Sequence, residues 1–207
     1  MGAADISAFW TLERTARLLP ARRGLRKALP ALLFFTDPVR TPDPEAIAAR
    51  LPAGSAIVYR HFGAPDGEAR ARRLLAIARQ RKLKLLIGAD AALAVKVGAH
   101  GVHLPERQAH RAGPLKRAHP GWIVTSAAHD LTAARRGAAD AVVISVVFPS
   151  KSPSAAGVRA LGPVRLAALV RAAGRPAYAL GGVDNKKARR LIDAGLIGLA
   201  AVDGLRT

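Results

Sequence analysis

The sequence contains no cysteine, which excludes a disulfide framework and thiolate chemistry and fits a reducing compartment. It has no apolar run near the roughly 18 residues that a membrane-spanning helix needs. It also lacks a basic start followed by an apolar segment and a cleavage site. We therefore expect a soluble, cytoplasmic protein that does not enter a membrane.

Aromatic and acidic residues are scarce. Aromatics make up 4% of the 207 residues, and 14 Asp and Glu stand against 33 Lys and Arg, for a formal net charge of +19. The basic residues recur within helical periodicities such as "EARARRLLAIARQRKLK", which indicates a basic outer surface. Because no helix-turn-helix, zinc or aromatic stacking signature is present, nucleic acid is not expected as the main ligand. An acidic partner bound to this surface remains an alternative.

Short apolar runs alternate with alanine-rich amphipathic segments, a pattern typical of a parallel sheet wrapped by helices. Eight candidate strands cover residues 31–36, 55–60, 84–88, 101–104, 122–126, 141–147, 176–180 and 198–202. Candidate helices between them cover residues 44–51, 66–81, 91–97, 109–118, 131–136, 163–173 and 185–193. This count predicts a single (β/α)₈ TIM barrel over residues 31–207.

Both ends of the predicted barrel are unusual. After the eighth strand only "DGLRT" follows, so we expect a truncated final helix. Residues 1–30 form a basic amphipathic segment, which we expect to cover part of the barrel wall and to be broken by Pro20 and Gly24. The alternative is a loosely ordered arm that touches a partner.

A corner motif repeats along the chain. "KVGAHGVHL", "RRGAADAVVI" and "IDAGLIGLAAV" each end a helix at a small Gly or Ala turn and then enter a strand. Glycine there can adopt the left-handed conformation that terminates a helix.

Active sites of such barrels lie at the C-terminal ends of the strands, and three groups there favour anion binding. "GGVDN" places Gly181 and Gly182 before a helix start, where free amides attract phosphate. "FPSKSPS" supplies Ser150, Lys151 and Ser152, and Arg60 offers a fork that can hold phosphate at two points. A phosphate-bearing ligand is therefore expected at the mouth of the barrel.

Several of these stretches carry a family resemblance. "LLFFTDP", "IVYR", "LLIGADAALAVKVGAHGVHLPE", "AAHD", "ADAVVISVVFPSKS" and "ALGGVDN…AGLIGLAAV" resemble, in order and spacing, the thiamine phosphate synthase and thiazole tautomerase family. The resemblance implies a (β/α)₈ barrel that acts in thiamine biosynthesis and holds a thiazole phosphate near strands seven and eight, where Val202 lies. In the synthase, that thiazole is joined to an aminopyrimidine pyrophosphate, and Mg²⁺ held by carboxylates neutralises the leaving group.

The metal-binding corner of the family differs in this chain. The resemblance places the family's Asn-Asp pair on Gly88 and Ala89, and its second metal-binding aspartate on Gln108. Asp90 and Glu106 are the nearest acids. We therefore expect no metal site and no cofactor, with Mg²⁺ needed only if a synthase site has relocated to Asp90 and Glu106.

Three further positions differ from the family. A lysine expected after strand two falls on Phe62, and one expected in the strand-six loop falls on Pro153, which leaves Lys151 as a substitute. A serine expected to hold phosphate after strand eight is replaced by Asp203, whose charge would repel a phosphate dianion.

His129 stands where the resemblance places the proton-transferring histidine of the tautomerase branch, and it is predicted to be catalytic with Arg60. Because thiazole tautomerisation needs no metal, we favour a tautomerase (an isomerase) over the synthase (a transferase). A barrel that has lost catalysis and binds a phosphate ligand is the third reading. The alternative for "HD" is a helix cap. The expected ligand is a phosphorylated thiazole or thiamine phosphate, and the sequence predicts no oligomeric state.

Overall fold

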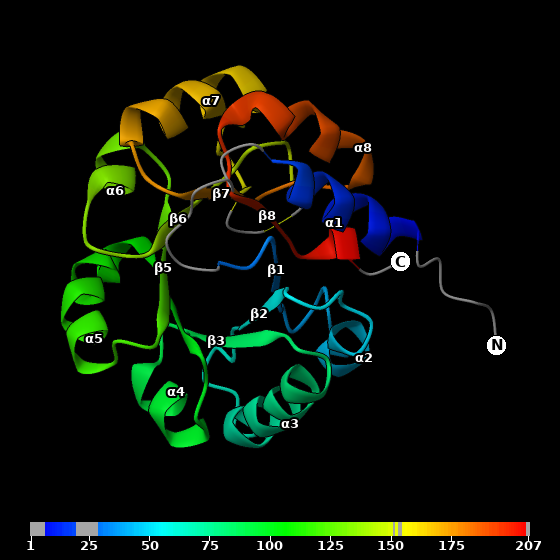
Figure 1. Ribbon diagram of the computed structural model, residues 1–207, viewed down its shortest axis with the longest axis vertical. Coiled ribbons are helices and arrows are strands. Elements are labelled where there is room, and N and C mark those ends of the chain that lie inside the picture. The colour runs from blue at the N-terminus through cyan, green and yellow to red at the C-terminus, as the bar shows by residue number, and fades with distance from the viewer. Residues whose placement is uncertain (1–6, 20–28, 151, 153–154, 206–207) are drawn as a thin grey trace.

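The computed structural model describes residues 7–19, 29–150, 152 and 155–205 of the chain. Within them, eight parallel strands pair in chain order and close into a barrel (Figure 1). Leu33 of β1 lies opposite Ala56 of β2 on one side and Ala200 of β8 on the other, which closes the ring. The strands are β1 (Leu32–Phe35), β2 (Ala56–Tyr59), β3 (Lys84–Gly88), β4 (Gly101–Leu104), β5 (Ile123–Ala128), β6 (Ala141–Ile144), β7 (Ala177–Ala179) and β8 (Gly198–Ala201). The TIM barrel predicted from the sequence is confirmed.

Helices surround this barrel (Figure 1). They are α1 (Ser7–Leu18), α2 (Pro44–Ala48), α3 (Gly67–Gln80), α4 (Ala91–Val97), α5 (Ala112–Ala118), α6 (Leu131–Arg135), α7 (Gly162–Ala173) and α8 (Asn185–Ala188), with 3₁₀ helices η2 (Glu106–Arg111), η4 (Arg189–Ala194) and η5 (Asp203–Leu205). The predicted helix 109–118 is in fact split between η2 and α5. Pro114 lacks the amide that a continuous α-helix would use there, but it fits the first turn of α5. The predicted helix 185–193 is α-helical only in α8 and continues as the 3₁₀ helix η4, because the spacing of apolar residues does not distinguish the two kinds of helix.

An aspartate begins each of the short helices that follow β1, β3, β5 and β7. The side chains of Asp43, Asp90, Asp130 and Asp184 accept the backbone N–H three residues ahead at 2.8 to 2.9 Å. Each carboxylate accepts a hydrogen bond from an amide that has no partner within the helix, and its negative charge interacts favourably with the positive end of the helix dipole. These caps fix where each helix starts, and so they fix the loops at the mouth of the barrel.

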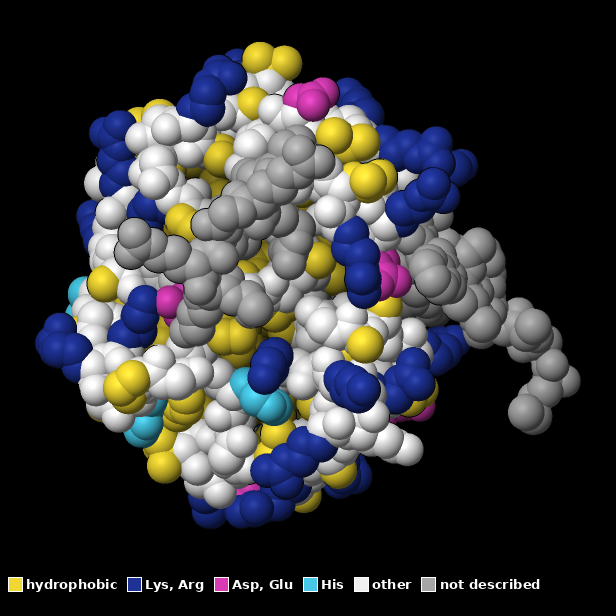
Figure 2. All heavy atoms as spheres, in the orientation of Figure 1, with side chains coloured by type: hydrophobic (Ala, Val, Ile, Leu, Met, Phe, Trp, Pro, Cys, Tyr) yellow, Lys and Arg dark blue, Asp and Glu magenta, His cyan; other side chains and the backbone are white. Residues whose placement is uncertain are grey.

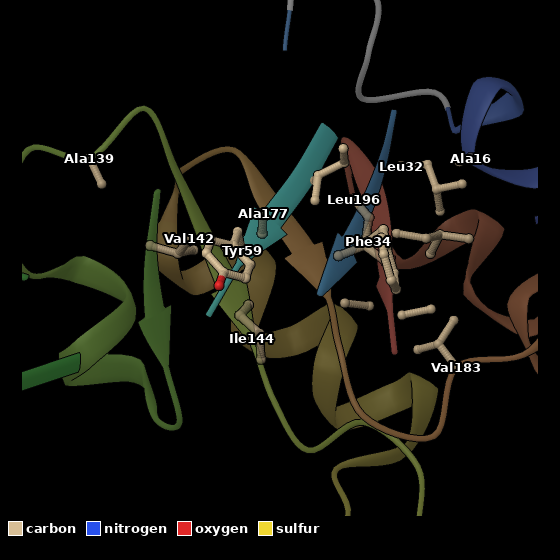
Figure 3. Packing of buried hydrophobic residues seen from close by; sticks show 14 of the residues in the cluster. Ala16, Leu32, Phe34, Tyr59, Ala139, Val142, Ile144, Ala177, Val183 and Leu196 are labelled. Carbon is tan, nitrogen blue, oxygen red and sulfur yellow. The ribbon is translucent and has the colours of Figure 1, made fainter. Parts of the chain in front are cut away.

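Side chains on alternate strand positions form two apolar layers. One cluster contains Leu33, Phe35, Val58, Val143 and Tyr178, and we place it inside the barrel because its strand members sit at every second position. The remaining strand positions face the helices and form the larger cluster. Figure 3 shows part of that outer layer, including Ala16, Leu32, Phe34, Tyr59 and Leu196.

Helix α1 packs outside β8 and β1, beside α8 and η4 (Figure 1). Leu12, Ala16 and Leu19 are buried at this contact. After β8 the described chain continues only as η5, so α1 covers a part of the wall that no described helix after β8 reaches. The expected N-terminal helical segment is confirmed, while its second piece, after Pro20 and Gly24, lies outside the described residues.

Arginine side chains tie α6 to α7. The guanidinium of Arg175 donates to the carbonyl oxygens of Arg136, Gly137 and Ala139 at 2.6 to 3.0 Å. In the opposite direction, Arg135 donates two hydrogen bonds to the carbonyl oxygen of Ala172, at 2.9 and 2.7 Å. Carbonyls at the ends of helices have no intrahelical partner, and these arginines supply one.

The exterior is basic, as the composition predicts. On the face shown in Figure 2, Lys and Arg side chains are spread around the outline of the molecule and acidic side chains are few. Among the described helices, none combines the length and apolar character needed to cross a membrane.

Candidate active site

A cavity of about 280 Å³ opens at the C-terminal ends of the strands. Its wall comes from the segments that follow β1, β2, β5, β6, β7 and β8, where the barrel fold places its active sites. The lining includes Arg40, Arg60, His129, Ser145, Ser150, Ser152, Gly181, Gly182, Asp184, Lys187, Val202 and Asp203.

The cavity collects the residues that sequence patterns assign to the site. Arg60, His129, Ser150, Ser152, Gly181, Gly182 and Val202 all line it. Lys151 lies outside the described residues. Their roles in binding and catalysis stay predictions, but the fold brings together side chains from strands that lie far apart in the sequence.

Arg60 is held rigidly at the mouth. Its Nε donates to the carbonyl oxygen of Thr36 at 2.8 Å, and its Nη2 lies 3.4 Å from Oδ2 of Asp37. The guanidinium carbon also lies 5.6 Å from the ring centre of Phe35 and 5.3 Å from that of Phe62. Burial lowers the pKa of Arg60 to about 10, so the group stays charged at neutral pH. Phe62, which replaces the lysine expected there, therefore contributes an aromatic face beside this cation.

Asp37 links two cationic side chains. Arg40 donates to Oδ2 of Asp37 at 2.8 Å, and the same oxygen faces Arg60. Burial alone would raise the pKa of Asp37, but hydrogen bonds from Arg40 lower it to about 2. Arg40 also pairs with Asp203 at 3.3 Å. The negative charge of Asp203, expected to repel phosphate, is thus faced by a positive charge at the rim.

His129 lies just after β5, and its ring is oriented by two contacts. Its backbone N–H donates to Oε2 of Glu106 at 2.9 Å, and its Nδ1 lies 3.0 Å from the carbonyl oxygen of Ser145. A carbonyl oxygen can only accept, so a hydrogen bond to it places the proton on Nδ1, and the Ser145 hydroxyl, 3.2 Å from the same nitrogen, can accept as well or can donate to an unprotonated Nδ1. With the proton on Nδ1, Nε2 of the neutral imidazole carries the free lone pair. Asp130, the next residue, caps α6, so the helix-cap alternative holds for Asp130 and leaves the His129 ring available.

The loop after β7 lines the cavity with two glycines. Gly182 has a φ of +63°, and a Cβ there would lie 2.5 Å from the carbonyl oxygen of Pro149, so only glycine fits. Among the described residues, Gly181 and Gly182 donate their amides to no other group. The helix start expected to bind phosphate is instead capped by Asp184, which also pairs with Lys187 at 2.7 Å. The two glycines therefore remain as the amide donors at this position.

The acids near the mouth are engaged and do not gather into a metal site. Asp90 caps α4 and lies 3.3 Å from Nε2 of His61, while Glu106 accepts the amide of His129. The described part of the chain contains no group of three or more His, Cys, Asp or Glu placed to hold a metal ion. Because Mg²⁺ requires several oxygen ligands, these residues do not fit it as they are arranged.

Sequence reasoning missed Arg40, Ser145 and Lys187. A signal existed for Ser145, because it continues the inward alternation of Ala141 and Val143 along β6. No comparable signal exists for Arg40, which lies in a turn after β1, or for Lys187, because α8 is too short to show a periodicity.

Comparisons with known proteins agree with this fold. The family model described as thiamine monophosphate synthase matches residues 32–205. The thiamine-phosphate synthase of Halorhodospira halophila is 33% identical over 187 residues, covering 85% of this chain and 88% of that protein. That of Alcanivorax borkumensis is 31% identical over 191 residues, covering 86% and 85%. Among solved structures, thiamine phosphate pyrophosphorylase from Pyrococcus furiosus superposes with a TM-score of 0.71 at 23% identity, covering 88% of this chain and 93% of that one.

Proposed function

The chain belongs to the thiamine monophosphate synthase family, and from that premise we propose that it binds a phosphorylated thiazole at the barrel mouth and moves a proton on it. The reaction would be a tautomerisation of the thiazole type, in which a proton leaves one atom of the substrate and returns at another. Such a reaction is balanced without an oxidant, a reductant or a metal ion.

The observation that carries this proposal is the hydrogen bond from Nδ1 of His129 to the carbonyl oxygen of Ser145, at 3.0 Å. It holds the ring at the wall of the cavity, and in the neutral tautomer with its proton on Nδ1 the basic nitrogen is Nε2. A general base must lie within hydrogen-bond reach of the proton that it takes, and it must return that proton without changing position. The contact from Glu106 to the backbone of His129 helps hold the ring in place.

The phosphate end of the ligand would lie across the cavity. The free amides of Gly181 and Gly182 support an oxyanion position there, and Ser150, Ser152 and the backbone near Val202 lie on the same wall. Arg60 would face the anionic groups of the substrate, because its guanidinium is charged and fixed between two aromatic rings.

A turnover assay with thiazole carboxylate phosphate tests the proposal. We expect the wild-type chain to catalyse proton exchange equally with and without EDTA. His129→Ala should lower kcat by about 10² to 10⁴-fold, as removal of a general base does. His110→Ala is the matched control, because His110 is an exposed histidine of η2 outside the cavity. Equal activity of the two variants would contradict the role of His129.

The names of the relatives favour a synthase as the second candidate, and in this chain its magnesium site would have to lie at Asp90 and Glu106. This function would require both acids to leave the contacts that now hold them. Activity that disappears with EDTA and with Asp90→Ala, but survives His129→Ala, would favour it over the tautomerase.

A barrel that has lost catalysis is the third possibility. Isothermal titration with thiazole phosphate and with thiamine phosphate, each with and without Mg²⁺, separates it from the other two. Metal-independent binding without turnover of any substrate would leave a phosphate-binding protein of this family.

A further inference from the structure

A second groove, of about 450 Å³, lies outside the barrel mouth. Phe148 and Pro149, which follow β6, line it together with Arg159 from the next loop, Arg165 from the first turn of α7 and Arg190 from η4. We call it the arginine groove. Pro149 lines both this groove and the mouth cavity, so one segment of backbone separates the two.

The charge of the arginine groove is unbalanced. Its lining includes three arginines and no acidic residue. Within the described ranges, none of the three forms an ion pair, whereas Arg40, Arg60, Arg70, Arg72 and Arg73 all do. Like charges brought together without a partner repel one another, so an anion in the groove would relieve a repulsion that the fold itself leaves uncompensated.

The groove is also held in shape. The amide of Leu161 donates to the carbonyl oxygen of Val146 at 3.0 Å, and the amide of Gly162 donates to that of Val147 at 2.9 Å. These two bonds fasten the start of α7 to the end of the β6 segment. On the other wall, the guanidinium carbon of Arg190 lies 5.5 Å from the ring centre of the buried Phe148. The start of α7, which carries Arg165, is therefore anchored, and the Arg190 side chain packs on Phe148.

From this arrangement we propose that the arginine groove binds the phosphate chain of a small oligophosphate-bearing molecule, at a site separate from the mouth cavity. Each guanidinium presents a planar fork that matches a phosphoryl group with two hydrogen bonds. Because three guanidinium groups come from three chain segments, a ligand with several linked phosphoryl groups matches them better than a single phosphate does. The volume also lies within the range of small-molecule sites, roughly 300 to 1,000 Å³.

The first test is isothermal titration of the full chain with inorganic tripolyphosphate at fixed ionic strength. We compare the double variant Arg165→Gln/Arg190→Gln with the control Arg117→Gln/Arg171→Gln, which removes the same charge at exposed arginines outside the groove. The groove variant should bind about tenfold or more weakly, because it loses two charge-assisted phosphate contacts, while the control should match the wild type. An equal loss in both variants would mean diffuse attraction to the basic surface and would overturn the site.

Two further arms locate the ligand and define its class. Arg60→Gln weakens anion binding at the mouth alone, so it should leave the loss caused by Arg165→Gln/Arg190→Gln unchanged, whereas binding that disappears with Arg60→Gln alone would place the anion in the mouth instead. Hydrogen exchange should slow at residues 159–166 when tripolyphosphate is added. No binding by the wild type, or tighter binding of a poly-glutamate peptide than of tripolyphosphate, would refute an oligophosphate site. Because His129 takes no part in these measurements, a failure of the tautomerase proposal would not affect them.

Discussion

At the scale of single residues, the mouth of the barrel is organised by charges that compensate one another. Asp37 lies between Arg40 and Arg60, and Arg40 reaches on to Asp203, so the acids orient the cations that face the cavity. The arrangement explains how Asp203 can stand where a phosphate-binding residue is expected. Its charge is shared with Arg40 instead of being presented alone to a ligand.

The low pKa of Asp37 makes stability depend on pH in the acid range. The folded state holds this pKa at about 2, below the ordinary value of 3.8. The carboxylate therefore stabilises the fold above about pH 4, and this contribution is lost as pH falls towards 2. We expect the free energy of unfolding to fall less steeply between pH 4 and pH 2 in Asp37→Asn than in the wild type. Asp193→Asn, at an exposed acid, should keep the wild-type slope in urea titrations; equal slopes in all three proteins would contradict this assignment.

His103 gives a second pH dependence, at higher pH. It is buried, its Nδ1 lies 2.9 Å from Oγ1 of Thr125, and burial lowers its pKa to about 3. The neutral ring is compatible with the fold, and the unfolded chain takes up a proton below its ordinary pKa of 6.5, so stability is lost as pH falls from 6.5 towards 3. Between pH 7 and pH 5 the loss from this residue should reach as much as about 2 kcal/mol. His103→Gln should remove that component of the slope and His110→Gln should not, as measured by denaturant unfolding at each pH.

Alanine substitutions at Gly182 and Gly174 distinguish the energetic cost of backbone strain from that of steric conflict. Both have a left-handed φ, +63° and +64°, but a Cβ at Gly174 meets nothing within 4 Å, whereas one at Gly182 meets the carbonyl oxygens of Pro149 and Phe148. Gly174→Ala should cost about 1 to 2 kcal/mol from its dihedral alone. Gly182→Ala should cost more and should also weaken binding of thiazole phosphate at the mouth. Similar losses of stability in thermal unfolding, with unchanged binding, would show that this loop moves aside.

At the scale of elements, the arginines between α6 and α7 allow a test of whether guanidinium geometry stabilises the packing of two helices. Arg175 donates to three carbonyl oxygens that end α6 and begin the approach to β6. Arg175→Lys keeps the charge but cannot reproduce the planar fork, so we expect a loss of about 1 to 3 kcal/mol in unfolding free energy. Arg171→Lys, at an exposed position of α7 just before Arg175, should change stability little. If both variants unfold alike, the fork geometry contributes nothing.

The sequence predicted the elements well because the barrel imposes strong local patterns. Most strands are short apolar runs that are buried on both faces, and β4 and β8 begin after small-residue corners at Gly98 and Gly195, which have the expected left-handed φ. The contact between His129 and Ser145, and the Asp37 link between Arg40 and Arg60, could not be predicted. His129 reaches the carbonyl oxygen of Ser145, and Arg60 reaches Asp37, from neighbouring strands, so these two contacts depend on the closed barrel and not on spacing along the chain.

At the scale of the whole molecule, a net charge of +19 opposes folding through self-repulsion. Added salt screens that repulsion, since the Debye length shortens to about 8 Å at 0.15 M. Raising NaCl from low concentration to 0.15 M should therefore increase Tm by about a few degrees, because the general repulsion outweighs the surface ion pairs that salt weakens. A Tm that falls in scanning calorimetry would show that local ion pairs dominate.

The place of α1 also sets the order in which the chain can complete its fold during synthesis. α1 precedes all eight strands in the chain, but of the elements that it packs against only β1 follows it early, whereas α8, η4 and β8 come after the other strands of the barrel. Most of the apolar face of α1 therefore stays exposed until the greater part of the barrel has been synthesised. A nascent chain stalled before β8 should accordingly be open to chaperone capture at its N-terminal helix, and that exposure should end once the last strand is released.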